Sequence, residues 1–172
     1  DDRSLETLAG TIAHHLKQLD GLLHSAHQFL SLTPLHLQTL EQWQSLMRVN
    51  LIAPSALTRA CLPLLHQSPD ASVIFTGETH GHQPGAYWGG YAVAKSGLET
   101  LTRIWADELG TEDNLRINTL IPGQVATTLR SRTHPGLAPD TLPSVDDLMP
   151  WYLHLMGADG RAVRGQVVEC QT

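Results

Sequence analysis

The sequence has few cysteines and no long apolar run. Its 172 residues include two cysteines, Cys61 and Cys170, which lie far apart and form no CxxC pair. This spacing excludes a cysteine-based zinc framework and favours a reducing compartment. No apolar stretch approaches the ~20 residues that a membrane-spanning helix needs, and the first residues do not resemble a signal peptide. We therefore expect a cytoplasmic protein with no membrane partner.

Positive charge is also scarce. Eleven lysine and arginine residues stand against 17 aspartate and glutamate residues, which gives a net charge of −6. Proteins that bind nucleic acid usually carry a basic excess, so we expect no nucleic-acid partner. The chain is 41% hydrophobic and has no internal repeat, which suits one packed core. We treat residues 1–172 as a single domain.

Helical and strand patterns alternate along the chain. Apolar residues recur at helical spacing in three segments, Leu5–Leu16, Leu40–Leu65 and Tyr91–Leu109. Short apolar runs predict strands at Leu19–Leu23, Ala71–Phe75, Leu115–Ile121 and Gly165–Cys170. A further helix should open at Ser144, because Asp147 can complete a capping box with it. This alternation predicts an α/β fold with a mostly parallel sheet and helices on both faces.

The segment from Thr127 to Pro143 has no sustained period. It contains Pro135, Gly136 and Pro139, so we expect a loop with a short helix at most. In parallel sheets, ligands bind at the carboxyl ends of the strands. The candidate site residues are therefore those just after the strands, in segments 24–27, 76–82 and 122–128.

Tyr91 and Lys95 lie four residues apart in a predicted helix, so their side chains share one face. An adjacent ammonium favours the phenolate form of tyrosine, whose ordinary pKa is near 10. The pair could therefore act as a general acid or base for a carbonyl and its alcohol. Coincidence is the alternative, and the spacing alone does not decide between them.

Several segments resemble the short-chain dehydrogenase/reductase family. Residues 19–26 resemble its fourth strand, 49–51 its helix with an active-site asparagine, and 116–118 with 122–127 its sixth strand and nicotinamide-side loop. Residues 75–76, 81–83, 88–91 and 149–157 are similar to its YciK-type branch of oxidoreductases. The resemblance implies the C-terminal portion of a Rossmann-like, doubly wound fold. It also implies hydride transfer between NADP or NAD and a small-molecule carbonyl or secondary alcohol.

The resemblance assigns roles to individual residues. Tyr91 would be the proton donor, Lys95 would lower its pKa, and Asn50 would anchor a water-mediated proton relay to Lys95. Pro54 has no N–H, so the helix should bend and free the carbonyl of Asn50. A bend that merely fits the helix to the sheet is the alternative.

A cofactor segment is also implied by the resemblance. Val125 and Thr127 would contact the nicotinamide carboxamide, within a loop that begins with Pro122 and Gly123. Without the resemblance, this segment is equally well explained as an ordinary turn after a strand.

Three departures from the family pattern bear on activity. Glu78 stands at the position of the catalytic serine, and an ionised carboxylate cannot donate a hydrogen bond to an oxyanion. Residues 24–27 lack the glycine of the family's Asn-Asn-Ala-Gly. The glycine-rich phosphate loop that binds pyrophosphate is also absent. We therefore expect an N-terminally incomplete domain that binds cofactor weakly. The alternatives are a non-catalytic scaffold for dimerisation or ligand sensing, and the retained part of an intact enzyme.

Ten histidines raise the question of a metal site. His24, His27, Glu78, His80 and His82 all follow predicted strands, and two histidines with a carboxylate could bind a metal. Scattered histidines without a known ligand spacing are usually surface or core residues, so we expect no metal.

The two long helices should also mediate association. Each has more apolar residues than one sheet-facing stripe requires, namely Leu57, Ala60, Cys61 and Leu64 on one and Leu98, Leu101, Thr102 and Trp105 on the other. The family builds a four-helix interface from such helices, so we expect a homodimer or homotetramer.

Overall fold

The computed structural model describes residues 2–111 and 113–170. At its centre is one sheet whose four strands run parallel in the order β1 (Gly21–His24), β2 (Ala71–Thr76), β3 (Leu115–Ile121) and β4 (Val167–Glu169). The helices are α1 (Asp2–His15), α2 (Leu40–Met47), α3 (Ala53–Leu65), α4 (Thr79–His82), α5 (Gly89–Leu109), α6 (Thr128–Thr133) and α7 (Met149–Met156). No helix in the described part of the chain combines the length and apolarity needed to cross a bilayer.

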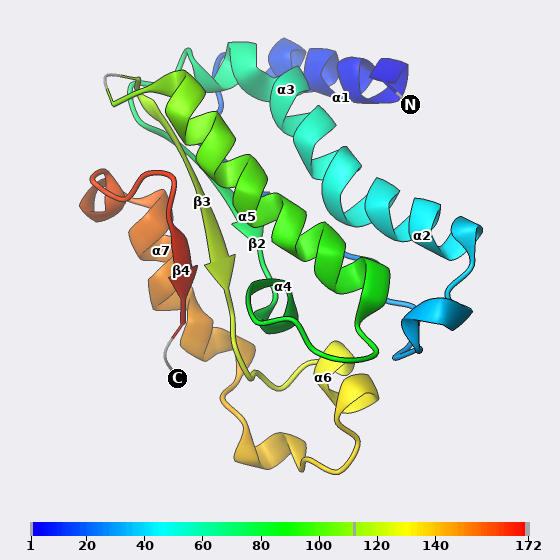
Figure 1. Ribbon diagram of the computed structural model, residues 1–172. Coiled ribbons are helices and arrows are strands. Elements are labelled where there is room, and N and C mark those ends of the chain that lie inside the picture. The colour runs from blue at the N-terminus through cyan, green and yellow to red at the C-terminus, as the bar shows by residue number, and fades with distance from the viewer. Residues whose placement is uncertain (1, 112, 171–172) are drawn as a thin grey trace.

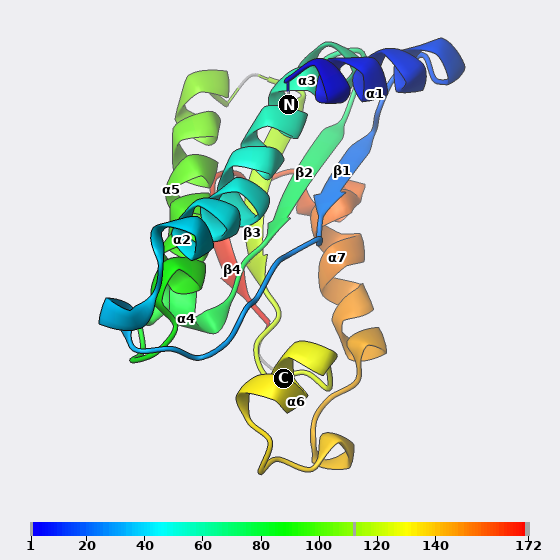
Figure 2. The same cartoon turned by 90° about the vertical axis from the view of Figure 1, so that its right-hand side faces the viewer.

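The sheet is covered on both faces, which confirms the predicted α/β architecture. Val73 and Phe75 of β2 pack against α3 and α5, through Cys61, Leu65 and Leu98. The alternate residue Ile74 faces α7, where it packs against Leu155 and other side chains. The two sides of each strand thus serve two different cores, because successive side chains of a strand point to opposite faces. Figure 2 shows the resulting layers, with α5 and α3 on one side of the strands and α7 on the other.

Two predicted strands are shorter than the sequence suggested. Leu19 donates its N–H to the carbonyl of Leu64 at the end of α3, at 3.0 Å, and so does not join the sheet. At the other edge, the side chain of Asn118 accepts from the N–H of Gln166 at 3.0 Å and donates to the carbonyl of Val163 at 2.7 Å. The Asn118 side chain thus satisfies the N–H of Gln166, whose carbonyl accepts from the N–H of Thr119, and the regular strand β4 begins at Val167. β3 has the predicted bounds.

The helix predicted over residues 40–65 is interrupted. A π-helical segment, Arg48–Ile52, separates α2 from α3, and the N–H of Ala53 reaches back to the carbonyl of Arg48. Pro54 lies in the first turn of α3, where its missing N–H is tolerated. The predicted bend at Asn50 therefore takes the form of a widened turn, as is frequent at functional sites.

The segment after β3 matches its expectation. α6 is six residues long, and the short 3₁₀ helix Pro139–Thr141 is the next regular element after it. Ser144 and Asp147 form the predicted capping box, which opens the 3₁₀ turn Val145–Leu148 that leads into α7. The remaining 3₁₀ turns are Leu35–Leu37 and Ala158–Gly160. In Figure 1, α4 and α6 lie at the end of the sheet to which the strands point, opposite α1.

The eight residues named on the two long helices divide into two groups by their burial. Cys61, Leu64, Leu98 and Thr102 are buried against the sheet, so they are not available to a second subunit. Leu57, Ala60, Leu101 and Trp105 are partly buried at the margin of the same core. A groove between α3 and α5 is lined by Leu101 and Trp105 together with Leu51, Ile52 and Ile104. Helical spacing alone does not show which of these residues face the sheet, and the predicted association stays a prediction.

Candidate active site

A cavity of about 660 Å³ opens at the carboxyl ends of the strands. Residues after β1, β2 and β3 line it, together with the start of α5, all of α6 except Ser131, and Tyr152 of α7. It lies where a parallel sheet is expected to bind ligands. Of the predicted site residues, it brings together Tyr91, Lys95, Pro122, Gly123, Val125 and Thr127.

Tyr91 and Lys95 are placed by the first two turns of α5. Both residues are only 3% exposed, although each lines the cavity. The Lys95 ammonium donates to the carbonyl of Thr76 at 2.6 Å and lies 5.8 Å from the centroid of the Tyr91 ring. The turn before the helix holds Tyr87 at φ 75° and Gly89 at φ 41°, both in the left-handed region. This backbone directs Tyr91 inward while Tyr87 remains exposed.

Burial changes the acid–base properties of both groups. It lowers the pKa of Lys95 to about 8, against the opposing effect of the Glu78 charge. Burial, with a further contribution from Glu78, raises the pKa of Tyr91 above its ordinary value. The net shift of the Tyr91 pKa is upward because burial and the Glu78 carboxylate disfavour the phenolate; the predicted lowering contribution of Lys95 stays a prediction. Tyr91 holds its proton here and can donate it.

Glu78 lines the cavity, but both of its carboxylate oxygens are engaged by His80. It precedes α4, where its carboxylate accepts from the backbone N–H of His80 at 2.6 Å and lies 3.1 Å from Nδ1 of the same residue. The His80 ring stacks on Trp88 with centroids 3.8 Å apart. The carboxylate thus has a structural use as a helix cap. Thr76 and Thr79 supply hydroxyls to the same cavity lining.

The short helix α4 was not predicted, and it fixes Glu78 relative to Lys95. Gly81 lies so close to α5 that a Cβ atom there would be 2.7 Å from the Cβ of Lys95. His82 then bonds through Nδ1 to the buried Glu99 of α5 at 2.9 Å. Four residues between a glycine-rich turn and a proline give too short a pattern for prediction.

Asn50 is buried but does not line the cavity. Its amide group makes a two-way contact with the backbone of Gln28, with Oδ1 accepting from N–H and Nδ2 donating to the carbonyl, both at 2.9 Å. Gln28 itself lines the cavity. The Asn50 side chain therefore holds the segment after β1 in place. The proposed relay through its main-chain carbonyl stays a prediction.

The loop after β3 adopts a shape that suits close approach of a ligand. Gly123 has φ 76°, a conformation that favours glycine, and Pro122, Gly123 and Val125 line the cavity. Thr127 caps α6 by accepting from the N–H of Arg130 at 3.2 Å. The predicted contact residues therefore surround one space, together with Tyr91.

The histidines do not converge on a metal site. His24 bonds through Nε2 to the Thr58 hydroxyl at 2.9 Å and stacks on Phe75, and burial lowers its pKa to about 4. His80 and His82 pair with different carboxylates. Among residues 2–111 and 113–170, no three His, Cys, Asp or Glu side chains form a group that could hold a metal ion.

Sequence reasoning missed several residues of the cavity wall. Phe29, Trp88 and Tyr152 contribute aromatic rings, and Arg130 and Arg132 contribute guanidinium groups. Phe29 comes from the long connection after β1, where no motif marks it. The arginines lie in the segment that had no periodic pattern, so their position could be found only from the fold.

Comparison with known proteins links the cavity to a family. A family model described as enoyl-(acyl carrier protein) reductase matches residues 1–150. The uncharacterised oxidoreductase YciK of Escherichia coli K12 is 38% identical over 166 residues, covering 96% of this chain and 65% of YciK. The short-chain dehydrogenase/reductase cdmF of Talaromyces verruculosus is 31% identical over 114 residues, covering 66% of this chain and 44% of cdmF.

Solved structures of short-chain dehydrogenases are also similar to this chain. A short-chain dehydrogenase from Pseudomonas syringae superposes with a TM-score of 0.95 at 38% identity, covering 99% of this chain and 69% of that protein. A short-chain dehydrogenase from Escherichia coli CFT073, in complex with NADPH, has a TM-score of 0.95 at 37% identity, covering 100% of this chain and 71% of its own. The chain thus spans about two thirds of the length of these relatives.

Proposed function

The chain belongs to the short-chain dehydrogenase/reductase family, and we propose that it catalyses hydride transfer between a nicotinamide cofactor and a carbonyl compound or secondary alcohol. The observation that carries this proposal is the placing of Tyr91 and Lys95 side by side in the wall of the cavity. A protonated phenol beside a buried cation is suited to give a proton to an alkoxide. The NADPH complex of a relative supports the choice of cofactor.

The roles of the residues follow from their environments. Tyr91 keeps its proton because it is buried, and it donates that proton to the carbonyl oxygen as negative charge develops there. Lys95 has a pKa near 8, held by burial, and its ammonium can stabilise the resulting phenolate. The carbonyl of Thr76 orients the ammonium. Asn50 acts by holding Gln28 in the wall.

The described residues fit the nicotinamide half of the cofactor. The turn at Gly123 leaves backbone groups open to an amide, and Val125 and Thr127 lie beside it in the lining. When bound, the nicotinamide would supply the hydride. The sequence shows no glycine-rich loop for the pyrophosphate, so we propose that this 172-residue chain by itself binds NADPH or NADH no tighter than about millimolar.

The test is substitution of the proton donor. Tyr91→Phe should lower NADPH-dependent reduction of an aldehyde or dicarbonyl by about 10²-fold or more, because it removes the general acid. Tyr87→Phe is the matched control, since this tyrosine is 57% exposed and lies outside the lining. The assay uses the full-length protein. Equal rates for Tyr91→Phe and the unsubstituted protein would remove Tyr91 from the mechanism.

A second candidate function is a non-catalytic scaffold that binds a ligand or a partner. Glu78 favours it, because its carboxylate caps α4 and offers no proton to an oxyanion. Under this alternative, the cavity would bind cofactor or carbonyl compounds without turnover. Single-turnover hydride transfer at saturating NADPH would reject the scaffold.

We also propose that the protein forms a homodimer or homotetramer in the cytoplasm. The groove between α3 and α5 exposes Ile52 and Ile104, at 57% and 49%, beside Leu101. Leu101→Glu should dissociate the assembly at micromolar concentration, as measured by light scattering. Leu8→Glu is the control, because Leu8 is similarly exposed at 45% but lies on α1. A monomer without any substitution would contradict this proposal.

A further inference from the structure

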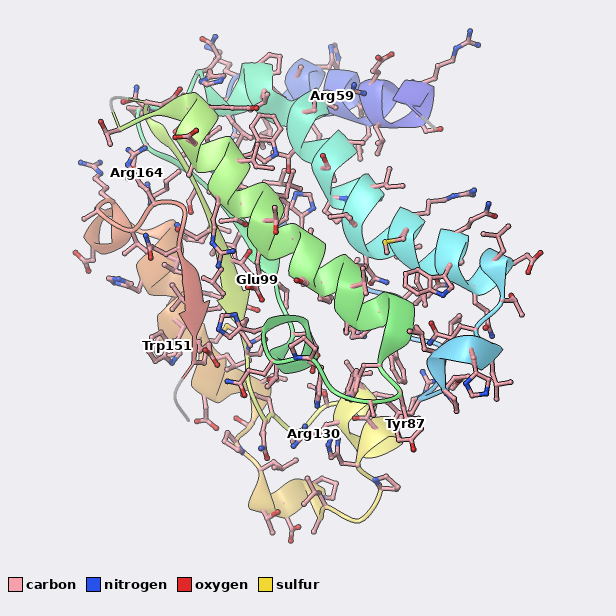
Figure 3. The ribbon with its side chains drawn as sticks, viewed as in Figure 1. Arg59, Tyr87, Glu99, Arg130, Trp151 and Arg164 are labelled. Atoms are coloured by element: carbon pink, nitrogen blue, oxygen red, sulfur yellow. The ribbon has the colours of Figure 1, made fainter. Side chains whose placement is uncertain are left out.

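The guanidinium group of Arg130 makes no hydrogen bond or ion pair with the residues that the structure describes. Its Nε atom is buried and has no hydrogen-bond acceptor, and no carboxylate of the described residues lies within 4.0 Å of it. The side chain lines the cavity, below α4 in Figure 3. A buried N–H without an acceptor is costly and rare in folded proteins. The group is therefore placed to bind an acceptor that enters the cavity.

Arg132, in the same cavity wall, differs from Arg130 because its guanidinium group makes contacts within the protein. Its Nη2 donates to the carbonyl of Leu30 at 2.6 Å, and its guanidinium lies 5.4 Å from the centre of the Phe29 ring. It fastens α6 to the segment after β1. Arg130 has no such contacts, although it lies only two residues earlier in the same helix.

The charges around the cavity favour an anion. Three permanent or near-permanent cations line it, namely Lys95, Arg130 and Arg132. Glu78 is the carboxylate in the lining, and both of its oxygens are already engaged by His80. An uncompensated guanidinium in a partly enclosed site attracts carboxylates strongly, through short charge-assisted hydrogen bonds.

The remaining wall is apolar and aromatic. Phe29 and Trp88 lie 5.7 Å apart between centroids and are both mostly buried, and Tyr152 lines the cavity from α7. Such walls bury the apolar body of a ligand, while a few polar groups fix its orientation. The ligand should therefore combine an apolar part with one anionic group.

We propose that the substrate is an oxo acid, a carbonyl compound with a carboxylate, and that Arg130 binds its carboxylate while Tyr91 meets its carbonyl. This inference rests on the proposed function, because it assigns the substrate class of the same cavity. Arg130 is a specificity-determining residue in this account. Phosphate oxygens of the cofactor offer a guanidinium the same chemistry, so the experiment must separate the two sources.

The test measures binding by calorimetry on the whole protein. Phenylpyruvate is the probe, and phenylacetone is its counterpart without the carboxylate. The unsubstituted protein should bind phenylpyruvate at least about tenfold more tightly, and Arg130→Gln should remove that preference, which corresponds to about 1.4 kcal/mol. Arg48→Gln is the control, because Arg48 is exposed on the π-helical segment and does not line the cavity. Equal binding of the two probes by the unsubstituted protein would overturn the inference.

Two further arms make the result decisive. NADPH is titrated into the same variants, and Arg130→Gln should leave its affinity within threefold; a large loss for NADPH with none for phenylpyruvate would assign Arg130 to the cofactor instead. If Arg130→Gln fails to fold, Arg130→Lys replaces it, and an unchanged preference would contradict the inference. NADPH-dependent reduction of both probes at equal rates would leave the proposed function standing without the oxo acid. Arg130-dependent binding of phenylpyruvate without any reduction would support the carboxylate site at Arg130 and would contradict the proposed function.

Discussion

The two ends of the sheet each hold a buried cation, and the two are bonded very differently. Arg116 of β3 lies at the amino end, where it pairs with Asp70 and donates to the carbonyls of Leu155, Met156 and Gly157, the last at 2.8 Å. Lys95 lies at the carboxyl end and has one acceptor, the carbonyl of Thr76. Both residues are 3% exposed or less.

Under the proposed function, Arg116 is a structural cation and Lys95 takes part in the reaction. The bonds of Arg116 fix the end of α7 against β2 and β3, and Arg116 is not among the residues that line the cavity at the carboxyl ends of the strands. Asp70 completes the group, because the hydrogen bonds and charges of Arg161 and Arg116 outweigh its burial and hold its pKa below the usual range. Lys95 is left under-coordinated next to Tyr91, with a lowered pKa. Under the proposed function, the buried cation with fewer hydrogen-bond partners lies at the end of the sheet where the reaction takes place.

Removing the satisfied cation should have the largest effect on stability. Arg116→Met should lower the free energy of unfolding by about 3–5 kcal/mol, because it removes the guanidinium donor from three carbonyl groups and leaves Asp70 with the exposed Arg161 as its remaining arginine partner. Urea denaturation measures the change. Arg161→Met is the control at less than about 1 kcal/mol, since Arg161 bonds the same carboxylate but is 63% exposed. A loss of similar size for both variants would show that burial does not distinguish them.

The pH dependence of the free energy of unfolding should report the lowered pKa of Lys95. The pKa of Lys95 falls from 10.5 to about 8 on folding, so the unfolded chain binds more protons between these values and stability rises with pH there. Lys95→Met should be more stable than the unsubstituted protein at pH 7, and the gap should shrink by about 3 kcal/mol by pH 10.5. Comparison of the two proteins cancels the tyrosines and cysteines, which titrate in both. If the difference in free energy of unfolding between the two proteins stayed constant from pH 7 to pH 10.5, folding would not lower the pKa of Lys95.

Glu78→Ser should raise the turnover of the proposed active site. Serine can still cap α4 and also donates a hydrogen bond, so turnover of a generic aldehyde should rise about 10- to 100-fold, or about 1.4–2.7 kcal/mol. The same change should lower the pKa of Tyr91, because Glu78 raises it. The pH–rate profile measures both effects. Unchanged turnover would indicate that Thr76 or Thr79 already supplies the hydroxyl, and Thr76→Val and Thr79→Val distinguish the two.

The smallest effect concerns the link between α4 and α5. The hydrogen bond to Glu99 raises the pKa of His82, so its contribution to stability is fully present below pH 6.5 and is lost as the pH rises through the raised value. His82→Gln should cost less than about 1 kcal/mol at pH 5.5 and still less at pH 8.5, because the ring is 35% exposed. Thermal unfolding at the two pH values checks this. A larger loss at pH 8.5 would contradict the assignment.

Much of the fold could be predicted because strands and long helices leave periodic patterns. β3 and the capping box at Ser144 were predicted correctly. The strand ends were not, since Leu19 and Asn118 make hydrogen bonds that depend on distant elements. The spacing also did not assign the apolar residues of α3 and α5 to the inward or the outward side, because both sides are apolar.

The candidate site was predictable where one element carries two groups. The spacing of Tyr91 and Lys95 predicted a shared helix face, and both side chains line the cavity. The aromatic walls and Arg130 come from segments without periodicity, and only the folded chain brings them to the cavity. The raised pKa of Tyr91 was also beyond sequence reasoning, because it depends on how completely the ring is buried.

The most direct test of the account is Lys95→Met, measured for both stability and rate in the same preparation. We predict that the free energy of unfolding at pH 7 does not fall, because a buried charge with one acceptor is replaced by an apolar chain of similar length. The rate of NADPH-dependent carbonyl reduction should fall at least about 10²-fold, since the phenolate of Tyr91 loses its counter-charge. A loss of stability of the size expected for Arg116→Met, with the rate preserved, would show that Lys95 is a structural cation and would contradict the account.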